Sequence, residues 1–577
     1  MATIQSKLSR GHKYWYIVES RRVNGKPRPV VLAYLGKADD LLKRLQGLHT
    51  HRLKSYSHGA VSILIDVAAR LNIVSILNKH VKSSRDYMAE KPVRNNLTTG
   101  ITFVLGAIGR VCMPTSKMGW WNWARGTSVE YLLRCNLSKV DSQHFWELMD
   151  SFPEDAICLA EQEILARLLD VYQIRTDTLF YDTTNFFTYI DTTNTHNEIA
   201  QRGKNKQKRY DLRQVGLAMV VSTEDYIPLF HHSYQGNLQD GTVFKGLIGK
   251  IKDRMASLGL KQDTHTLVFD RGNNSMKNLS IVRESGFYYV GALTPYHHKE
   301  IIDRAMQEMT TISLNDESIA VYRERTTIWE DERTILVFVS DRLKAGQIRG
   351  VYQGLAKIEK SLKELHQSLT NPKGRRRNRE ELEKKINTIT KGQYLKDILK
   401  WKLIETGDRK YYLDYHIDQE QLNNLEDRLG FRIIMTNRHE WTSKEIITAY
   451  YGQSKIEHAF RNMKNPYHLA LKPQYHWTDQ KIKVHYFICV IGYLLSSVIW
   501  REARLKAGYT GSLDNLLDTL NEIRLGTMLE KSEKTGKPKA TYVLEEMTET
   551  EQRIITALGV ENAHNEQPRI KHVGVYN

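Results

Sequence analysis

Three acidic residues in this sequence could together hold divalent cations. Asp182 and Asp270 each end a short apolar run with the composition of a buried strand, and Glu457 lies far downstream, within residues 450–464. Carboxylate oxygens are ligands that Mg²⁺ prefers in proteins. The chain is also strongly basic, with a formal net charge of +18. A carboxylate trio in a basic chain predicts phosphodiester chemistry on nucleic acid.

Residues 450–464 have the spacing of one continuous helix. Tyr450, Glu457 and Lys464 are seven residues apart, which places them on one stripe of a helix with 3.6 residues per turn. We expect Glu457 at the margin between core and solvent, held rigidly but within reach of a metal ion. The neighbouring apolar stripe predicts a buried seam made of Ile446, Ala449, Ile456, Phe460 and Met463.

The chemistry that suits such a trio is cleavage of a phosphodiester with two divalent ions, which lie roughly 3.5–4 Å apart in such sites. We expect Asp182 to bridge both ions because it ends the central strand, with Asp270 and Glu457 on either side. A lone aspartate after a strand more commonly forms a turn or a cap. Three carboxylates in this order favour the metal site, and we place four others outside it: Asp191, Asp211, Asp225 and Asp240.

The composition argues against several other classes of protein. The four cysteines lie far apart without a Cys-X-X-Cys pair, which argues against a zinc ribbon or a disulfide framework and fits a reducing cytosol. The first residues lack the apolar core of a signal peptide. The apolar run at residues 486–500 is too short and interrupted to span a bilayer, so it predicts a buried core helix. A basic surface without a polyanionic partner remains the alternative explanation of the charge.

The hydrophobic pattern predicts strands first, then helices, then a mixed region. Residues 12–36 alternate as in a β-hairpin, and residues 58–175 follow helical spacing. The next segment predicts three strands, a helix, a strand, a helix and a strand between residues 179 and 293. Further on we expect strands at 321–327, 333–339, 410–417 and 430–436, and a helical hairpin with a basic tip at residues 373–377. The tail after residue 510 is charged and only weakly patterned.

Several motifs together resemble a known family. They are YDTTNF around Asp182, FDRGNNS around Asp270, the spacing of Tyr450, Glu457 and Lys464, and the opening stretch YWYIVESRRVNGKPRPVVLAYLG. The sequence resembles bacterial insertion-sequence transposases of the DDE class, in the insertion-sequence-four-like superfamily. The signature of that group is Tyr, two residues, Arg, three residues, Glu, six residues, Lys. Gln453 stands at the Arg position here, so the role of that guanidinium must be weaker or must fall to Lys455 or Arg461.

The resemblance implies an α+β fold, and the predicted strand and helix order is that of a ribonuclease-H-like domain. The catalytic domain would have a mixed sheet, in which the first and fourth strands are neighbours, together with a strand-containing insertion and a helical N-terminal module. The expected limits are 1–50 for an N-terminal β-hairpin region, 51–175 for a helical module that binds the terminal repeats, 176–297 for the first part of the catalytic domain, 298–440 for the insertion, 441–510 for its second part and 511–577 for a C-terminal region.

The resemblance also implies the activity. It predicts an enzyme that binds the terminal inverted repeats of its element, pairs two ends, and cuts and pastes them with two Mg²⁺ ions, for which Mn²⁺ can substitute. Double-stranded DNA, both element ends and target, would be the partner, with a homodimer in the synaptic complex, no membrane, and a location in the bacterial cytoplasm near the nucleoid. Two alternatives stay open: a nuclease of the same fold that does not join strands, and a non-catalytic DNA-binding descendant acting as a repressor.

Basic residues near the three carboxylates are candidates for phosphate contacts. Lys464 would contact a phosphate beside the scissile bond, while Tyr450 would either touch DNA or serve in packing. Arg271, next to Asp270, is a phosphate contact or a solvated turn residue. The run at residues 202–209, which ends in Lys208 and Arg209, would follow the DNA backbone, although such runs are commonly just solvated.

Overall fold

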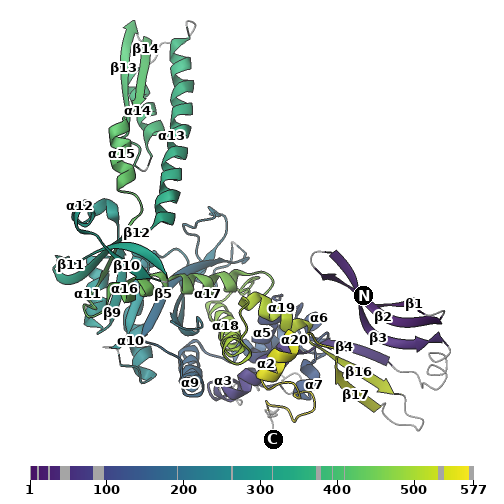
Figure 1. Cartoon of the computed structure of the whole chain (residues 1–577). Helices are drawn as coiled ribbons and strands as arrows, with labels where there is room; N and C mark the ends of the chain where they lie inside the picture. Colours follow the sequence, from purple (N-terminus) through teal and green to yellow (C-terminus); the bar gives the residue numbers. More distant parts are fainter. Residues whose placement is uncertain are drawn as a thin grey trace. The chain divides into compact units, whose positions relative to one another are not determined.

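The computed structural model of this chain folds into two compact units. It describes residues 2–9, 12–23, 26–38, 52–81, 97–191, 193–261, 264–314, 316–371, 378–392, 394–407, 410–530 and 539–570. The first unit consists of Met1–Gln239, Lys250–Leu260 and Ser454–Asn577, and the second of Asp240–Gly249 and Lys261–Gln453. Both contain helices and strands, so the chain is of the mixed α+β type (Figure 1).

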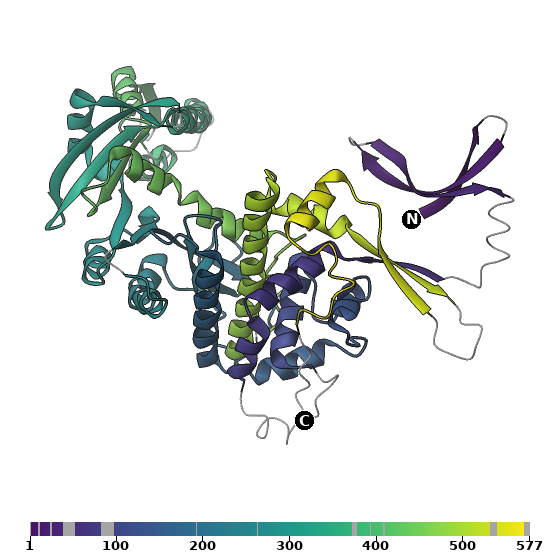
Figure 2. The ribbon, with the colours of Figure 1, turned by 60° about the horizontal axis from the view of Figure 1, so that its bottom comes forward.

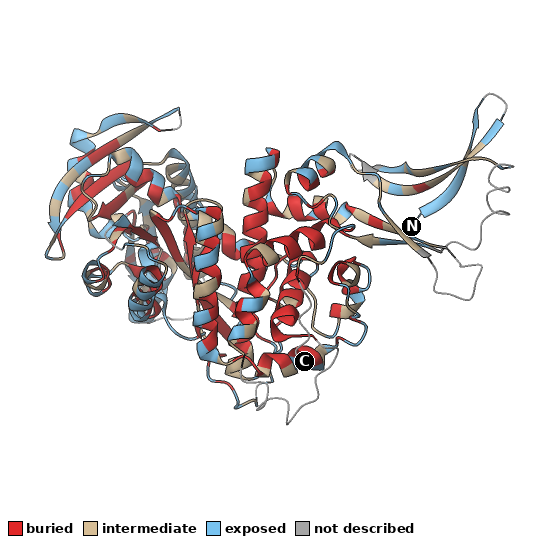
Figure 3. Ribbon diagram, turned by 90° about the horizontal axis from the view of Figure 1, so that it is seen from below, coloured by how far each residue is buried: buried red, intermediate tan, exposed pale blue. Residues whose placement is uncertain are grey.

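The first unit is built around one long apolar helix, α18 (Asp479–Ala507). Other helices contact it, and in Figure 2 they surround it as purple and blue ribbons: α2 (Gly59–Arg70), α5 (Thr99–Cys112), α8 (Ser142–Asp150) and α9 (Glu154–Tyr172). The helix is longer than the apolar run predicted, and it has the length and hydropathy of a membrane span. However, 94% of its most apolar window is buried inside the protein, which agrees with the predicted core helix (Figure 3).

Three antiparallel strands of the first unit carry the first predicted carboxylate. They are β5 (Thr178–Phe187), β6 (Gln214–Ser222) and β7 (Pro228–Gln235), with β6 in the middle. Every residue of β6 is buried. Helix α17 (Ser454–Lys464) packs on β5 and β6, and α18 packs on β7, so the strands are covered by helices that lie more than 200 residues further along the chain.

The N-terminal region forms a sheet of its own. Strands β2 (His12–Val23) and β3 (Lys26–Lys37) pair as the predicted hairpin, and β1 (Ala2–Ser9) adds a third antiparallel strand. The expected turn at residues 24–25 lies outside the described residues. Downstream helices of the helical region are α3 (Ile73–Lys79), α6 (Trp120–Ala124) and α7 (Val129–Leu133).

The C-terminal tail is more regular than its sequence pattern predicts. It contains α19 (Leu513–Glu522), β16 (Arg524–Glu530), β17 (Lys539–Leu544) and α20 (Glu549–Ala557). Strand β16 pairs with β17 and also with β4 (Arg52–Ser57), which lies at the other end of the sequence. The weak sequence pattern did not predict these elements, because the strands are stabilised by a partner that local sequence does not reveal.

The second unit contains a mixed sheet with the strand order β10-β11-β12-β15-β9-β8. Only the pair β8–β9 in this set is parallel, and the other pairs are antiparallel. The strands are β8 (Thr266–Phe269), β9 (Tyr288–Leu293), β10 (Thr310–Leu314), β11 (Glu317–Ile328), β12 (Asp331–Val339) and β15 (Phe431–Thr436). The helices of this part are α11 (Met276–Glu284), α12 (Lys299–Glu308) and α16 (Ser443–Tyr451).

A helical hairpin and a two-stranded sheet extend the second unit. Helices α13 (Asp341–Thr370) and α14 (Arg379–Thr390) contact each other, and α13 also contacts β14 (Lys410–Ile417) (Figure 1). Strand β13 (Leu399–Gly407) and helix α15 (Gln419–Asp427) complete this part, which has its own hydrophobic core. The hairpin agrees with the prediction, whereas its basic tip at residues 373–377 lies outside the described residues.

The element order around the predicted carboxylates follows the sequence pattern. After β5, β6 and β7 come α10 (Asp240–Ser257), β8, α11 and β9, which is the predicted order of three strands, helix, strand, helix and strand. Helix α10 contributes residues to both units. The predicted order of elements is confirmed.

Candidate active site

Asp182 lies in the middle of strand β5, which continues to Phe187, so the prediction that it ends its strand was wrong. It lies on the face of β5 that helix α17 covers. Side chains two residues apart point to the same face of a strand, so Asp182 shares its face with Phe180, Thr184 and Phe186. Asp182 is half-buried, whereas Phe180 and Phe186 are buried beside it. The strand thus fixes the backbone of the carboxylate while leaving its side chain partly accessible.

Two lysines of α17 show how the helix lies along this strand. The Lys455 Nζ stands 5.6 Å from the Phe180 ring centroid and donates a hydrogen bond to the Thr223 carbonyl. Nine residues later, the Lys464 Nζ stands 5.4 Å from the Phe186 ring and donates to the Thr184 hydroxyl. The helix therefore runs in the same direction as β5, with its two lysines on either side of the position of Asp182.

Glu457 lies within this stretch of helix and faces the same side as Lys464. The two residues are seven apart on α17, so they occupy nearly the same angular position on the helix. The Lys464 ammonium reaches Thr184 on β5, and Glu457 shares this face of the helix. Glu457 is exposed. The structure therefore brings two of the three predicted carboxylates, Asp182 and Glu457, onto adjoining elements of one unit.

The Lys464 ammonium sits in a field of like charges. Burial lowers its pKa below the usual range, and the neighbouring Lys206 and Lys472 lower it further. Asp182 acts on this pKa in the opposite direction and raises it. Lys464 is thus close enough to Asp182 for direct electrostatic interaction, and a phosphate in this region would relieve the repulsion among the three lysines.

Asp270 belongs to the second unit and follows strand β8. Its Oδ1 accepts a hydrogen bond of 2.6 Å from the Arg271 backbone N–H, and it caps the short 3₁₀ helix η2 (Arg271–Asn273). Both Asp270 and Arg271 are exposed. Asp270 therefore has the cap contact expected of an isolated aspartate, and its side chain is exposed.

The donor set suits a hard cation, although it does not amount to a finished metal cage. Among the residues that the structure describes, no group of three or more His, Cys, Asp or Glu is arranged to hold a metal ion. Asp182 and Glu457 supply carboxylate oxygens from one half-buried and one exposed position, which is the ligand type of Mg²⁺. The participation of Asp270 remains a prediction.

The predicted single helix over residues 450–464 is wrong. The segment forms two helices, α16 and α17, which are separated at Gly452 and Gln453. There the Gln453 N–H donates to the Tyr450 carbonyl at 3.1 Å, a tighter pattern than that of an α-helix. Glycine has a low helix propensity, which explains why the break falls here. The buried seam is nevertheless confirmed, since all five of its residues are buried: Ile446, Ala449, Ile456, Phe460 and Met463.

The break places Tyr450 away from the stripe that it was expected to share. Tyr450 lies on α16 in the second unit, whereas Glu457 and Lys464 lie on α17 in the first. The Tyr450 hydroxyl accepts a hydrogen bond of 2.9 Å from Arg432, whose guanidinium also stands over the ring at 5.6 Å. The ring packs edge-on against Phe338. These contacts correspond to the packing alternative.

The remaining basic candidates differ in the hydrogen bonds and ion pairs that they form within the protein. Arg209 forms two hydrogen bonds with Asp211, at 2.8 and 2.7 Å, and this pairing lowers the pKa of Asp211 to about 2. Lys208 is exposed in a turn at φ +57°, and Arg461 is exposed on α17. Lys455 donates to a backbone carbonyl, as described above. Of this group, Lys208 and Arg461 are the most accessible to a DNA phosphate.

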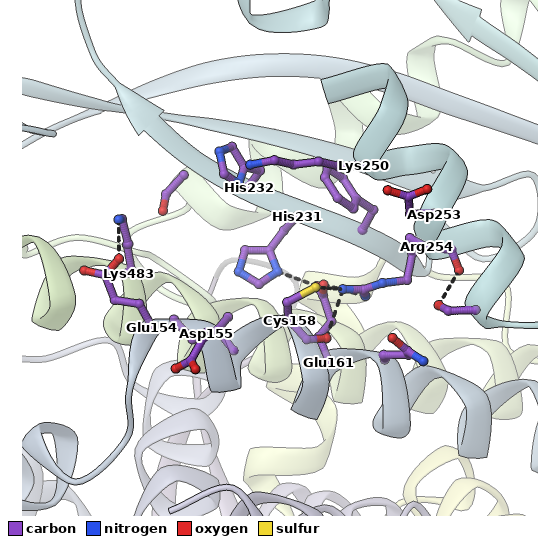
Figure 4. A pocket seen from close by; sticks show the side chains of 15 residues that line it. Glu154, Asp155, Cys158, Glu161, His231, His232, Lys250, Asp253, Arg254 and Lys483 are labelled. Atoms are coloured by element: carbon purple, nitrogen blue, oxygen red, sulfur yellow. Dashed lines mark hydrogen bonds and ion pairs between the residues drawn. The ribbon is translucent and has the colours of Figure 1, made fainter. Parts of the chain in front are cut away.

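A pocket in the first unit contains a buried cluster of charged and ionisable side chains that the sequence did not indicate. Its cavity of about 660 Å³ is lined by α9, β7 and α10, and Figure 4 shows Glu161 between His231 and Arg254. The Arg254 Nη1 is 2.6 Å from the Glu161 carboxylate, and His231 contacts the same group. Burial opposes the charge, but Arg254 and His231 lower the pKa of Glu161 to about 2. All three side chains are nearly fully buried, so loss of one partner would leave an uncompensated buried charge between α9, β7 and α10.

Comparison with known proteins gives one family match. Residues 2–58 match the model described as IS1634 family transposase, N-terminal domain. No curated protein matches the sequence. A solved structure described as the piggyBac transposase synaptic complex with hairpin DNA has a TM-score of 0.37 and 8% sequence identity, covering 80% of this chain and 79% of that chain. The family match spans strands β1 to β4, so the function of the remaining chain has to be inferred from its own residues.

Proposed function

We propose that this protein is a DNA transposase of the DDE class with a ribonuclease-H-like catalytic core. It binds the terminal inverted repeats of an insertion sequence, cuts the strands and joins them to target DNA. The observation that supports the proposal is the packing of α17, which carries Glu457 and Lys464, against β5, which carries Asp182. The family match at residues 2–58 supports it independently.

The three carboxylates would divide the work of holding the metal ions. Asp182 would contribute oxygens to both ions from the fixed backbone of β5, Glu457 would contribute from α17, and Asp270 from the start of η2. When bound, two divalent ions activate the attacking oxygen and stabilise the leaving oxygen of the phosphodiester. The alternation of β5 keeps Asp182 on the helix-covered face, so its position does not depend on a flexible loop.

The basic residues would position the DNA strand at this site. Lys464, held between Thr184 and the ring of Phe186, offers its ammonium beside Asp182, where the phosphate next to the scissile bond would lie. Lys206 and Lys472 add positive charge around it. The carboxylates repel a bare phosphate, so productive binding requires the metal ions and these lysines together. This arrangement suits transfer of DNA strands in the bacterial cytoplasm, with two copies of the chain holding two ends.

A strand-transfer assay tests the proposal. The full chain is mixed with a labelled duplex carrying the ends of the surrounding DNA element, an unlabelled target duplex and Mg²⁺. Joined product is the expected result. Cleavage without joining would instead favour a nuclease, and a complex that neither cuts nor joins would favour a DNA-binding repressor. Omission of Mg²⁺, with recovery on addition of Mn²⁺, checks that the reaction depends on divalent ions.

A further inference from the structure

A second pocket in the first unit is lined by positive and aromatic side chains. Its cavity of about 340 Å³ lies among α5, α8, residues 116–118, residues 473–477 and the first turn of α18. The charged or ionisable residues that line it include Arg110, Lys117, Lys481 and His476, and no Asp or Glu of the described chain contributes to the lining. A cavity of this composition favours an anion.

Two of these cations have no carboxylate partner among the described residues. The Arg110 guanidinium, in a residue only 6% exposed, donates to the backbone carbonyls of Ala470 and Lys472, at 3.4 and 3.0 Å. The Lys117 Nζ lies 2.8 Å from the His476 Nε2. Lys481 differs, because it pairs with Asp150 at 3.0 Å. Arg110 and Lys117 are therefore inward-facing charges that the described part of the chain does not neutralise.

These two cations destabilise each other in a poorly solvated place. Burial, together with repulsion by Arg110, lowers the pKa of Lys117 to about 7. The neighbouring imidazole carries no negative charge that could compensate them, and burial holds the pKa of His476 well below its usual range. In addition, the buried Nδ1 of His476 has no hydrogen-bond partner within the described ranges. An entering anion would neutralise the cations and could accept from or donate to this imidazole nitrogen.

The mouth of the pocket exposes large aromatic rings. Trp146 of α8 is 44% exposed, Tyr475 56% and Trp477 51%. Exposed rings at this density are unusual on a surface that faces only water. Nucleic-acid bases stack on such rings regardless of their sequence, since every base has a π-face. The pocket thus combines two cations suited to a phosphate, Arg110 and Lys117, which we call the floor, with three rings suited to a base, Trp146, Tyr475 and Trp477, which we call the rim.

We propose that this pocket binds a nucleotide, with its phosphate on Lys117 and Arg110 and its base against the rings of Trp146, Tyr475 and Trp477. The cavity has the size of a small-ligand site. The inference rests on the proposed function in one respect, because DNA is the expected source of nucleotides. The nucleotide is either free or an unpaired unit of a bound DNA strand, and both sources present the same chemistry to the pocket.

Calorimetric titration of the full chain tests whether the pocket binds a free nucleotide. The probes are thymidine 5′-monophosphate, thymidine and inorganic phosphate. We expect the monophosphate to bind at least about 10-fold more tightly than either fragment, because only it engages both the floor and the rim. Equal affinity for phosphate and monophosphate would overturn the proposal, since the aromatic rim would then contribute nothing.

Binding of two DNA duplexes tests whether the pocket takes an unpaired nucleotide of a DNA strand. One duplex carries a single unpaired thymidine, and a matched duplex is fully paired. A tighter complex with the unpaired thymidine, abolished by substitution of the rim, supports a DNA-borne nucleotide. If the monophosphate does not bind and the unpaired thymidine gives no gain, the pocket is not a nucleotide site. If the same preparation still performs strand transfer, the proposed transposase activity stands even though the pocket binds no nucleotide.

Matched substitutions identify the pocket as the place of binding. Tyr475→Ala and Lys117→Met should each weaken binding of whichever nucleotide probe binds by about 10-fold or more. Their controls are Tyr467→Ala, which removes a more exposed tyrosine of the same segment, and Lys139→Met, which removes an exposed lysine outside the pocket. Tyr475 lies on the rim, so its loss should leave the fold intact. Equal effects of test and control variants would contradict the assignment.

Discussion

At the scale of single residues, the strongest consequence concerns Asp182 and Glu457. Both were predicted from sequence, and the structure places them on elements that pack against each other within one unit. Substitution Asp182→Asn or Glu457→Gln keeps side-chain shape but weakens metal binding, so strand cleavage should fall more than about 100-fold. DNA binding should persist, and a filter-binding assay run beside the cleavage assay checks this separation.

The control for these variants is Asp170→Asn, which changes an exposed carboxylate of α9 in the same unit. Its cleavage rate should match that of the unmodified chain. If Asp182→Asn or Glu457→Gln cut at a similar rate to Asp170→Asn, the changed carboxylate would not be a metal ligand. Asp270→Asn tests separately whether the exposed cap residue of the second unit takes part in the site.

A second residue-scale prediction compares two of the cations that are expected to contact phosphates. Lys464 lies among like charges, whereas Arg209 is already paired with Asp211. Lys464→Gln should therefore reduce the slope of log affinity against log salt concentration by about 0.9, the value of one phosphate contact. Arg209→Gln should change it less, because its charge is neutralised within the protein. Equal changes in slope would show that the pairing with Asp211 opens on binding.

A third prediction follows from the pKa of Lys117. That pKa is about 7 in the folded chain against an ordinary value of 10.5, so between these limits the unfolded chain binds more protons. Stability should consequently rise with pH across this window. Lys117→Met removes the effect, and it should raise the free energy of unfolding by about 1–3 kcal/mol at pH 7, where the unmatched charge costs most.

Urea denaturation at pH 7, 8.5 and 10 measures this difference. The advantage of Lys117→Met over the unmodified chain should shrink steadily toward pH 10. Lys139→Met, at an exposed position, should show little difference at any of the three values. An advantage that does not depend on pH would instead indicate a gain in apolar packing unrelated to charge.

At the scale of elements, the sequence was most informative where the spacing of a strand's or helix's own residues predicts it. Strand β14 was predicted at its observed limits, and the hairpin of α13 and α14 was recognised from leucine and isoleucine spacing. The pairing of β4 with β16 was missed, since it joins segments hundreds of residues apart and neither has a distinctive pattern. Asp182 and Glu457 were proposed from local signals, an apolar run and a helical stripe, although Asp182 lies within β5 and not at its end.

The division between α16 and α17 shows the limit of periodicity as evidence. The apolar seam continues across Gly452 and Gln453, and both halves are buried. The spacing of apolar residues is therefore the same for one helix as for two successive helices. One glycine costs a helix only about 1 kcal/mol, which tertiary contacts easily outweigh. The contacts of Tyr450 with Arg432 and Phe338 belong to the second unit, and the local sequence pattern does not predict them.

Backbone conformation at helix ends gives a prediction at this scale. Gly508 ends α18 at φ +60°, a left-handed conformation that disfavours a side chain, although no described atom would obstruct one. Gly106 lies within α5, where an added methyl group would meet neighbours at an ordinary 3.5 Å. Gly508→Ala should therefore destabilise the protein by about 1 kcal/mol, while Gly106→Ala should stabilise it by up to about 1 kcal/mol. Urea midpoints of the two variants, which carry the same chemical change, should shift in opposite directions.

At the scale of the whole molecule, positive charge is concentrated at the N-terminus. Residues 1–51 contain ten lysines and arginines against three acids, a net +7 out of the +18 of the chain. The sheet of β1, β2 and β3 carries most of this excess, and its first strand is almost entirely exposed. Such a surface is expected to attract a polyanion through release of counterions, largely without regard to sequence.

Removal of residues 1–51 should therefore reduce DNA affinity and flatten its salt dependence. The truncation leaves β4 and its pairing with β16 in place, so the sheet that joins the two ends of the sequence is kept. Fluorescence anisotropy with one duplex over a series of salt concentrations measures the slope, which should fall by roughly 0.9 for each phosphate that the shortened chain no longer neutralises. Circular dichroism of the truncated chain confirms that the helices persist. Because attraction by counterion release vanishes at high salt, the two proteins should converge there; a difference that survives at high salt would mean that these strands read the DNA through specific contacts.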